Sequence, residues 1–168
     1  MKTIIEHQIK KLEIDKPDFS KKYYQLVHQN ECFGSLMEMD DKETLSELVT
    51  SKGVFSVKRS GFFNPYITLR KGKFEQNEAK CYLNLRGESS IYLEGTTFHF
   101  KMNNVWKNQW CWLNEKNQIL ITLKPIISGT MKGEVEISKE AYHYPQLELL
   151  SLLGVYFLIK YQNETENL

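Results

Sequence analysis

The fold is decided by one apolar stretch near the C-terminus, Pro145-Gln-Leu-Glu-Leu-Leu-Ser-Leu-Leu-Gly-Val-Tyr-Phe-Leu-Ile-Lys-Tyr161. Pro145 suits the first position of a helix, and Glu148 lies in the first turn, where the helix dipole favours a negative charge. At about 100° per residue, the apolar side chains point in every direction, and only Ser151 interrupts the middle turns. The sequence therefore predicts a helix over residues 145–161 that lipid or protein must surround on all sides.

Lipid is the weaker candidate for these surroundings. The 15 residues from Leu147 to Tyr161 make roughly 22 Å of helix, whereas the hydrocarbon core of a bilayer is about 30 Å thick. Glu148 and Lys160 shorten the uncharged part further, and the polar tail 162–168 lacks the positive cluster typical of a cytoplasmic flank. We therefore expect protein around the helix and no transmembrane span.

The composition predicts one domain of ordinary size in a reducing compartment. A chain of 168 residues can bury its own core. Its 22 Lys and Arg residues nearly balance 21 Asp and Glu residues, so we expect no nucleic-acid partner. Three cysteines without a CxxC pair indicate reduced thiols, and residues 1–11 lack the apolar core of a signal peptide. We expect a cytoplasmic protein, with peripheral attachment to a membrane as one alternative.

The N-terminal segment 1–18 is predicted to be an arm or a short helix. Ile4, Ile5, Ile9 and Leu12 lie near one side of a helix over residues 3–13, with lysines opposite. The segment Lys16-Pro-Asp then interrupts this pattern.

Residues 19–140 alternate apolar and polar side chains in short runs between turn signals, a pattern typical of an antiparallel meander. The expected strands span residues 23–28, 32–39, 45–50, 54–59, 66–71, 80–85, 91–94, 97–103, 110–114, 118–124 and 134–138. A long meander with one apolar face can enclose a helix that is apolar on every side, and closure also removes the free edges of the sheet. We therefore predict a mainly β protein, with a closed antiparallel β-barrel of about a dozen strands around a buried hydrophobic C-terminal helix.

This arrangement resembles the tubby-like C-terminal fold, and in particular its branch of LURP-one-related proteins and phospholipid scramblases. The resemblance is carried by residues 145–159, which are similar to the buried helix of that branch, and by the strand pairs between residues 23 and 138. It implies a barrel around a central helix over most of the chain. It carries no catalytic motif, and neither the calcium segment nor the palmitoylated cysteines of scramblases are found in this sequence.

One stretch of the chain, residues 52–80, is locally basic. Its positive residues are Lys52, Lys58, Arg59, Arg70, Lys71, Lys73 and Lys80, against Glu75 and Glu78. In tubby proteins a basic pocket binds phosphoinositide headgroups, and the resemblance implies this role for Lys58, Arg59, Arg70 and Lys71. The leading hypothesis is a non-catalytic module that binds an anionic lipid headgroup or another phosphate-bearing partner there. The alternative for these residues is a solvated strand face.

The sequence nominates no catalytic residue, cofactor or metal. The GxSxG, P-loop and GxGxxG motifs are absent. His99 is expected to be an exposed polar residue, and the pair Glu134 and Glu136 to face outward on a strand. The acidic residues at positions 40, 41, 43 and 47 lack the ligand spacing of a calcium loop.

Two further hypotheses remain. One is an enzyme with an unrecognised site in a loop cleft, which a deep polar pocket around His99 or Glu134 would favour. The other is a structural or oligomeric protein without a small-molecule ligand. This second hypothesis is favoured if most of five aromatic residues are interior. These residues form either a stacking platform for a ligand or, as we prefer, part of the core. They are Phe98, Phe100, Trp106, Trp110 and Trp112.

Overall fold

The computed structural model describes residues 1–18, 20–40, 42, 44–72, 79–84, 88–125 and 133–166. Twelve antiparallel strands form one sheet in the order β7-β6-β5-β4-β3-β2-β1-β12-β11-β10-β9-β8. The strands are β1 (Lys11–Asp15), β2 (Tyr23–His28), β3 (Glu31–Glu38), β4 (Leu45–Thr50), β5 (Gly53–Ser60), β6 (Tyr66–Lys71), β7 (Ala79–Tyr82), β8 (Ser89–Leu93), β9 (Thr96–Asn104), β10 (Gln109–Leu113), β11 (Ile119–Lys124) and β12 (Gly133–Ile137). A short 3-10 helix, η1 (Lys139–His143), leads to the helix α1 (Leu147–Glu166).

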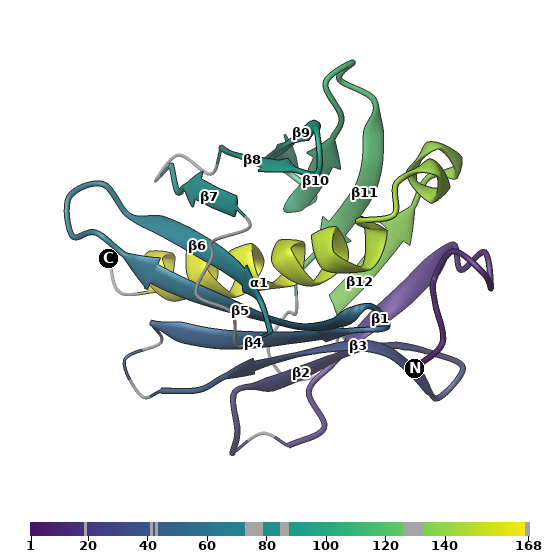
Figure 1. Ribbon diagram of the computed structural model, residues 1–168, viewed down its shortest axis with the longest axis horizontal. Coiled ribbons are helices and arrows are strands. Elements are labelled where there is room, and N and C mark those ends of the chain that lie inside the picture. Colours follow the sequence, from purple (N-terminus) through teal and green to yellow (C-terminus); the bar gives the residue numbers. More distant parts are fainter. Residues whose placement is uncertain are drawn as a thin grey trace.

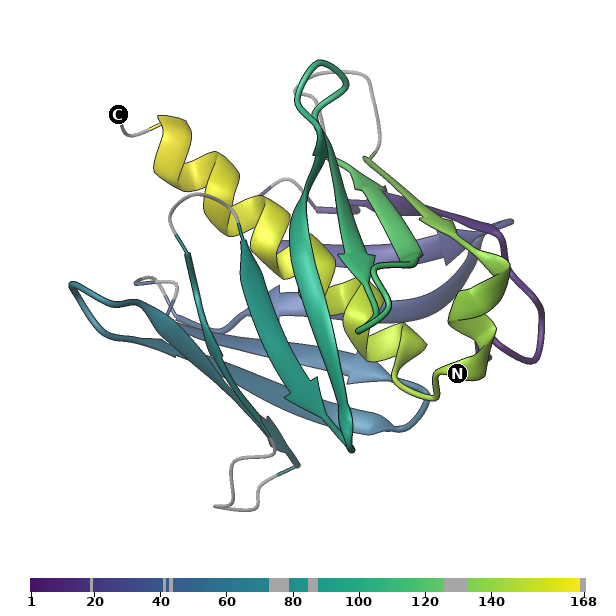
Figure 2. The same ribbon diagram turned by 90° about the horizontal axis from the view of Figure 1, so that it is seen from above.

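The sheet curls into a nearly closed barrel around α1 (Figures 1 and 2). Every residue of α1 from Leu147 to Lys160 is buried, including Leu153 and Phe157 at 0% exposure. The predicted fold class is therefore confirmed. Within the described part of the chain, no helix combines the length and the apolar character that crossing a bilayer requires.

The prediction for the N-terminal segment is wrong in part, because β1 (Lys11–Asp15) belongs to the barrel. This strand pairs with β2 on one side and with β12 on the other. Leu12 and Ile14 are buried while Lys11 and Glu13 are exposed, which is the period of two that a strand requires. Only the preceding residues form an arm, whose Ile4 and Ile9 are buried against the core.

The barrel closes at two places of unequal strength. All neighbouring strands are consecutive in sequence except β1 and β12, whose ladder runs from Lys11–Glu136 to Ile14–Gly133. At the other closure, β7 and β8 are the two ends of the sheet order, and the described residues show one backbone bridge there, between Leu83 and Ser89.

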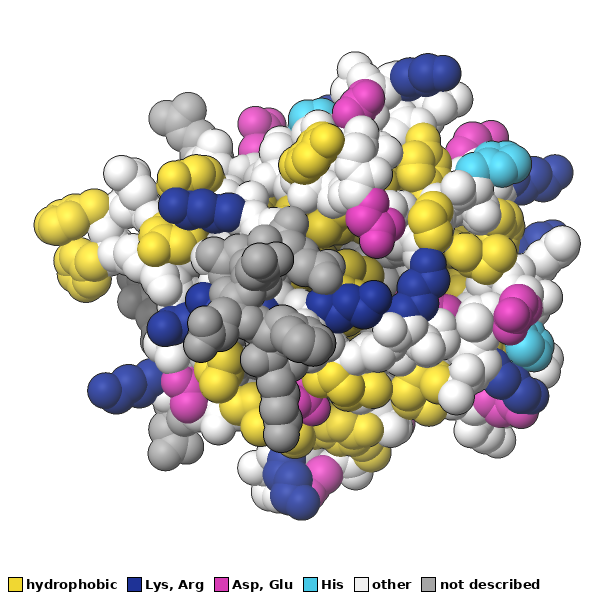
Figure 3. Space-filling model, viewed as in Figure 1, with side chains coloured by type: hydrophobic (Ala, Val, Ile, Leu, Met, Phe, Trp, Pro, Cys, Tyr) yellow, Lys and Arg dark blue, Asp and Glu magenta, His cyan; other side chains and the backbone are white. Residues whose placement is uncertain are grey.

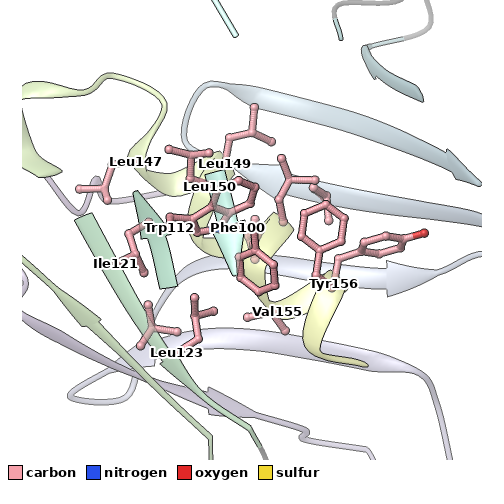
Figure 4. Close-up of a cluster of buried hydrophobic side chains, with 14 of the residues drawn as sticks. Phe100, Trp112, Ile121, Leu123, Leu147, Leu149, Leu150, Val155 and Tyr156 are labelled. Carbon is pink, nitrogen blue, oxygen red and sulfur yellow. The ribbon is translucent and has the colours of Figure 1, made fainter. Parts of the chain in front are cut away.

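One wall of the barrel approaches the helix very closely. Figure 4 shows Phe100, Trp112, Ile121 and Leu123 of this wall packed beside the helix residues. A Cβ atom on Gly154 would lie 2.7 Å from Leu123 Cδ2 and 2.9 Å from Trp112 Nε1. An alanine at position 154 would therefore require the Leu123 and Trp112 side chains to shift.

The two ends of the barrel are distinct, because connections of a meander alternate between them. We call the end where α1 begins the arm end; it carries residues 1–10 and the turns at 29–30, 51–52, 94–95 and 114–118. The opposite end, where α1 finishes, is the tail end. It carries the turns at 61–65 and 105–108.

Candidate functional site

The four basic residues predicted to form a site lie on neighbouring strands but face different ways. Lys58 and Arg59 belong to β5, and Arg70 and Lys71 belong to β6. Successive residues of a strand point to opposite faces of the sheet. Arg59 is in register with the buried Ile67, so it shares the inner face, whereas Lys58 and Arg70 are on the outer face.

The two inner-facing cations also lie at opposite ends of the barrel. Arg59 is at the tail end of β5, and Lys71 is at the arm end of β6, in register with the buried Phe55. The Lys71 ammonium is 5.8 Å from the centre of the Phe55 ring and borders a cavity of about 40 Å³. This cavity is too small for a phosphorylated headgroup, so the structure does not bring the four residues into one site.

The outer face brings together a different set of cations. Lys58 on β5 is in register with Thr68 on β6, which in turn is in register with Lys80 on β7. Because adjacent strands are about 4.8 Å apart, the backbones of the two lysines are about 10 Å apart. Arg70 lies two residues further along β6, at a distance of about 7 Å from Thr68. We call Lys58, Arg70 and Lys80 the outer basic face.

The Lys80 side chain is held in place by two aromatic rings. Its ammonium nitrogen lies 4.0 Å from the ring centre of Tyr66 and 4.7 Å from that of Tyr82. A hydrogen bond with the Tyr82 side chain, together with the two nearby phenol groups, raises the pKa of Lys80 above its ordinary value. Lys80 is therefore a positioned positive charge. The sequence alternates small or apolar with polar residues over this strand. In the structure Ala79 and Cys81 are buried, while Lys80 and Tyr82 are exposed.

A second feature of the outer wall is a groove over the closure between β7 and β8. It has a volume of about 580 Å³, and its lining includes Tyr82, Glu88, Ser90, His99 and Lys101. Ser90 Oγ and His99 Nδ1 are hydrogen-bonded at 2.8 Å. A serine hydroxyl hydrogen-bonded to an imidazole can serve as nucleophile and general base. Such a site also needs a third group that orients the imidazole. The described residues provide no hydrogen bond to the other ring nitrogen.

The carboxylates Glu134 and Glu136 are engaged in ion pairs on the outer wall. Lys124 lies 3.1 Å from Glu134 and 2.9 Å from Glu136, and Lys11 lies 2.6 Å from Glu134. Hydrogen bonds from Lys11 and then Lys124 hold the pKa of Glu134 below its ordinary value. A carboxylate stabilised in its ionised form is poorly suited to act as a general acid.

The acidic segment after β3 serves the local backbone. Asp40 accepts hydrogen bonds from the backbone N–H groups of Thr44 at 2.8 Å and Leu45 at 3.0 Å. Asp41 and Glu43 lie outside the described residues. Across the described ranges, no group of three or more His, Cys, Asp or Glu side chains is arranged to hold a metal ion.

The aromatic residues are divided between the core and the surface. Phe98, Phe100, Trp110 and Trp112 are buried, as predicted. Phe100 stacks on Trp110 with ring centres 5.4 Å apart. The prediction is wrong for Trp106, which is 99% exposed because it lies in the turn between β9 and β10 rather than on a strand.

The three thiols are free, and two of them are poor nucleophiles. Cys81 and Cys111 are fully buried, whereas Cys32 is partly exposed. Burial raises the pKa of Cys81 to about 12 and also raises that of Cys111. Because the thiolate is the reactive form, neither buried cysteine is a candidate catalytic residue.

Comparison with models of protein families, with curated proteins and with solved structures finds no match for this chain. The candidate function is therefore inferred from the surface of the barrel itself.

Proposed function

We propose that this protein is a non-catalytic binding module that attaches to phosphate groups through the outer basic face. The observation that carries the proposal is the register Lys58–Thr68–Lys80, which holds cations of β5 and β7 on either side of β6 and its Arg70. The favoured partner is an anionic lipid headgroup, as the resemblance to tubby-like proteins predicts. The module would then act in the cytoplasm, at a membrane surface.

The chemistry of the three side chains supports this proposal. The planar guanidinium of Arg70 can donate two parallel hydrogen bonds to one phosphate, and the lysines add point charges on either side. Each Lys or Arg close to an anionic membrane contributes about 1 kcal/mol to binding, so three contribute about 3 kcal/mol. The net charge of the whole chain is only +1. A local cluster would therefore orient the barrel on the membrane without making the protein a general polyanion binder.

The test is co-sedimentation with vesicles of phosphatidylcholine, with and without phosphatidylinositol phosphates. The triple variant Lys58→Ala, Arg70→Ala, Lys80→Ala should lose about 100-fold in affinity for the anionic vesicles. A matched control removes three exposed lysines near the arm end, Lys10→Ala, Lys116→Ala and Lys139→Ala, and should bind like the wild type. Equal binding by all three proteins would remove the proposal.

A second candidate function is hydrolysis at the groove, favoured by the hydrogen bond between Ser90 and His99. In that case Ser90 Oγ would attack an ester carbonyl while His99 accepts the hydroxyl proton; the ester C–O bond would break, the alcohol would leave with that proton, and water would then hydrolyse the acyl-serine. A fluorophosphonate probe should then label Ser90 in the wild type and label neither Ser90→Ala nor His99→Ala. Failure to label the wild-type protein would eliminate this candidate.

A further inference from the structure

Two turns at the tail end expose large apolar side chains to solvent. Phe62 and Phe63, between β5 and β6, are 92% and 88% exposed, and Val105 and Trp106, between β9 and β10, are 76% and 99% exposed. The β5–β6 turn projects at the left edge of Figure 1, where Figure 3 shows hydrophobic side chains at the margin of the molecule. The β9–β10 turn rises at the top of Figure 2. Isolated exposed apolar residues are common, but paired ones at the tips of two turns require an explanation.

The first turn is built to present its aromatic pair. Gly61 adopts φ +86°, and a Cβ atom there would lie 2.4 Å from the backbone oxygen of Asn64. Only glycine fits this position, so this shape of the turn, in which Phe62 and Phe63 are exposed, depends on Gly61. The Phe62 and Phe63 rings contact each other edge to face, with centres 5.1 Å apart.

The second turn is closed by its own hydrogen bonds. The Asn104 side-chain oxygen accepts the backbone N–H of Lys107 at 3.0 Å, and the Val105 carbonyl accepts the N–H of Asn108 at 3.2 Å. Asn108 has φ 47°, a conformation that asparagine tolerates better than most residues. These hydrogen bonds fix the backbone of the turn and so keep Val105 and Trp106 at its tip.

The surface between the two turns is positively charged. Across the closure between β7 and β8, the two ends of the sheet order, the turns flank β6, β7, β8 and β9. The described cations on the outer wall between Gly53 and Lys107 are Lys58, Arg70, Lys80, Lys101 and Lys107, because Arg59 and Lys71 face inward. The described carboxylates in this range are Glu88, beside the groove, and Glu94, which accepts a hydrogen bond from Gln146 at 2.6 Å at the arm end.

We infer that the two turns insert into the interfacial zone of an anionic bilayer while the outer basic face lies on its headgroups. This inference rests on the proposed function, because it takes the phosphate-bearing partner to be a lipid. Trp is enriched at the boundary between water and hydrocarbon, and Phe gains by leaving water. A bilayer accepts separate apolar points and cationic side chains at the same time, and its negative surface complements the charge between the turns.

Trp106 provides a direct test, because Trp110 and Trp112 are buried in the core and give a constant background. Vesicles of phosphatidylcholine with phosphatidylserine should shift the emission of the wild-type protein to shorter wavelength, and brominated lipid should quench it. The variant Trp106→Phe should lose both effects and still bind. An unchanged wild-type spectrum in the presence of bound vesicles would overturn the inference.

A second variant separates insertion from headgroup binding. Phe62→Ser with Phe63→Ser should weaken binding to these vesicles by about tenfold or more, because two aromatic side chains no longer leave water. Its affinity for inositol hexakisphosphate, a soluble polyphosphate, should stay unchanged. The control Val54→Ser with Ile119→Ser removes exposed apolar residues near the arm end and should keep vesicle binding.

The outcomes distinguish the two proposals. If the serine variant binds vesicles as tightly as the wild type, the insertion is wrong while headgroup binding stands. If the triple alanine variant of the outer basic face retains both vesicle and polyphosphate binding, the proposed function itself fails. A wild-type dimer that becomes a monomer in the serine variant would show instead that the turns mediate self-association.

Discussion

At the arm end of the barrel, α1 brings a carboxylate into the core, whereas at the tail end it brings in an ammonium group. Glu148 is 5% exposed and accepts the backbone N–H of Ile4 at 3.1 Å and that of Ser51 at 3.0 Å, together with the Ser51 hydroxyl. Lys160 is 2% exposed and lies 2.7 Å from the buried carboxylate of Glu38. Glu148 lies in the first turn of α1, where the helix dipole favours a negative charge, whereas Lys160 lies before the last turn and is stabilised by its carboxylate partner.

The difference between the ends lies in what each charge holds together. Neutral donors from the N-terminal arm and from the β4–β5 turn satisfy Glu148, so this interaction draws two loops over the start of the helix. At the tail end, Lys160 is paired with a residue of a strand, Glu38 of β3. This ion pair therefore draws neither of the described turns at 61–65 and 105–108 over the end of the helix.

The largest expected effect is at the tail end. Lys160→Met leaves Glu38 buried with Lys22, at 3.5 Å, as its one charged partner among the described residues. We expect a loss of about 3 kcal/mol in the free energy of unfolding, measured by urea denaturation. Adding Glu38→Leu should recover most of this loss, since it removes the unpaired buried charge. A single variant as stable as the wild type would mean that the pair does not hold this end.

A smaller effect is expected at the arm end. Glu148→Gln keeps the shape of the side chain but replaces one acceptor oxygen by an amide donor that faces other donors. We expect a loss of about 2 kcal/mol in unfolding free energy, because charge-assisted hydrogen bonds are lost and a buried donor is left unpaired. Amide hydrogen exchange should rise at Ile4 and Ser51, while exchange near Glu38 should stay unchanged. An equal rise in exchange near Glu38 would contradict the expectation that Glu148 stabilises only the arm end.

The exposed turns should contribute almost nothing to stability. Phe62→Ser, Phe63→Ser and Trp106→Ser combined should change the unfolding free energy by less than about 0.5 kcal/mol, as is usual for surface positions. The measurement is again urea denaturation, with circular dichroism as the signal. A large loss would show that these side chains are structural and would weaken the case for a binding role.

The smallest expected effect is a loss of stability at low pH. At the arm end a hydrogen bond from Lys2 lowers the pKa of Glu31, and at the tail end hydrogen bonds from Thr44 and Leu45 lower that of Asp40. A lowered pKa in the folded state stabilises the fold above the ordinary pKa, and this contribution is lost as the pH falls through the lowered value. The melting temperature should therefore decline below about pH 4. Glu31→Gln and Asp40→Asn should each flatten this decline slightly.

Much of the fold could be predicted because its signals are local. The absence of a polar side on the helix and the alternation of residues 97–103 are each visible within one segment. The strand β1 was harder to predict because Ile4, Ile9 and Leu12 also suit a helix. Its partner β12 is moreover distant in the sequence, so only the assembled sheet shows the pairing.

The candidate site was less predictable, because it depends on register across strands. The alternation of β5 already separates Lys58 from Arg59, a signal that a simple count of positive residues overlooks. The inclusion of Lys80, by contrast, requires knowing that Thr68 is in register with it. The exposure of Trp106 follows from its turn, which the asparagines at 103, 104 and 108 indicate.

The weak closure between β7 and β8 has a consequence for how the chain can be divided. A cut between Asn84 and Glu88 would separate β1–β7 from a second peptide that contains β8–β12 and α1. The cut falls between two strands that form no ladder with each other. In the described residues, β7 and β8 are joined only by the Leu83–Ser89 bridge. The two peptides would still share the β1–β12 ladder and the contacts of the helix with β3 and β4. Mixed in solution, they should reassemble into a native-like complex, which makes this protein suitable for splitting into complementary fragments.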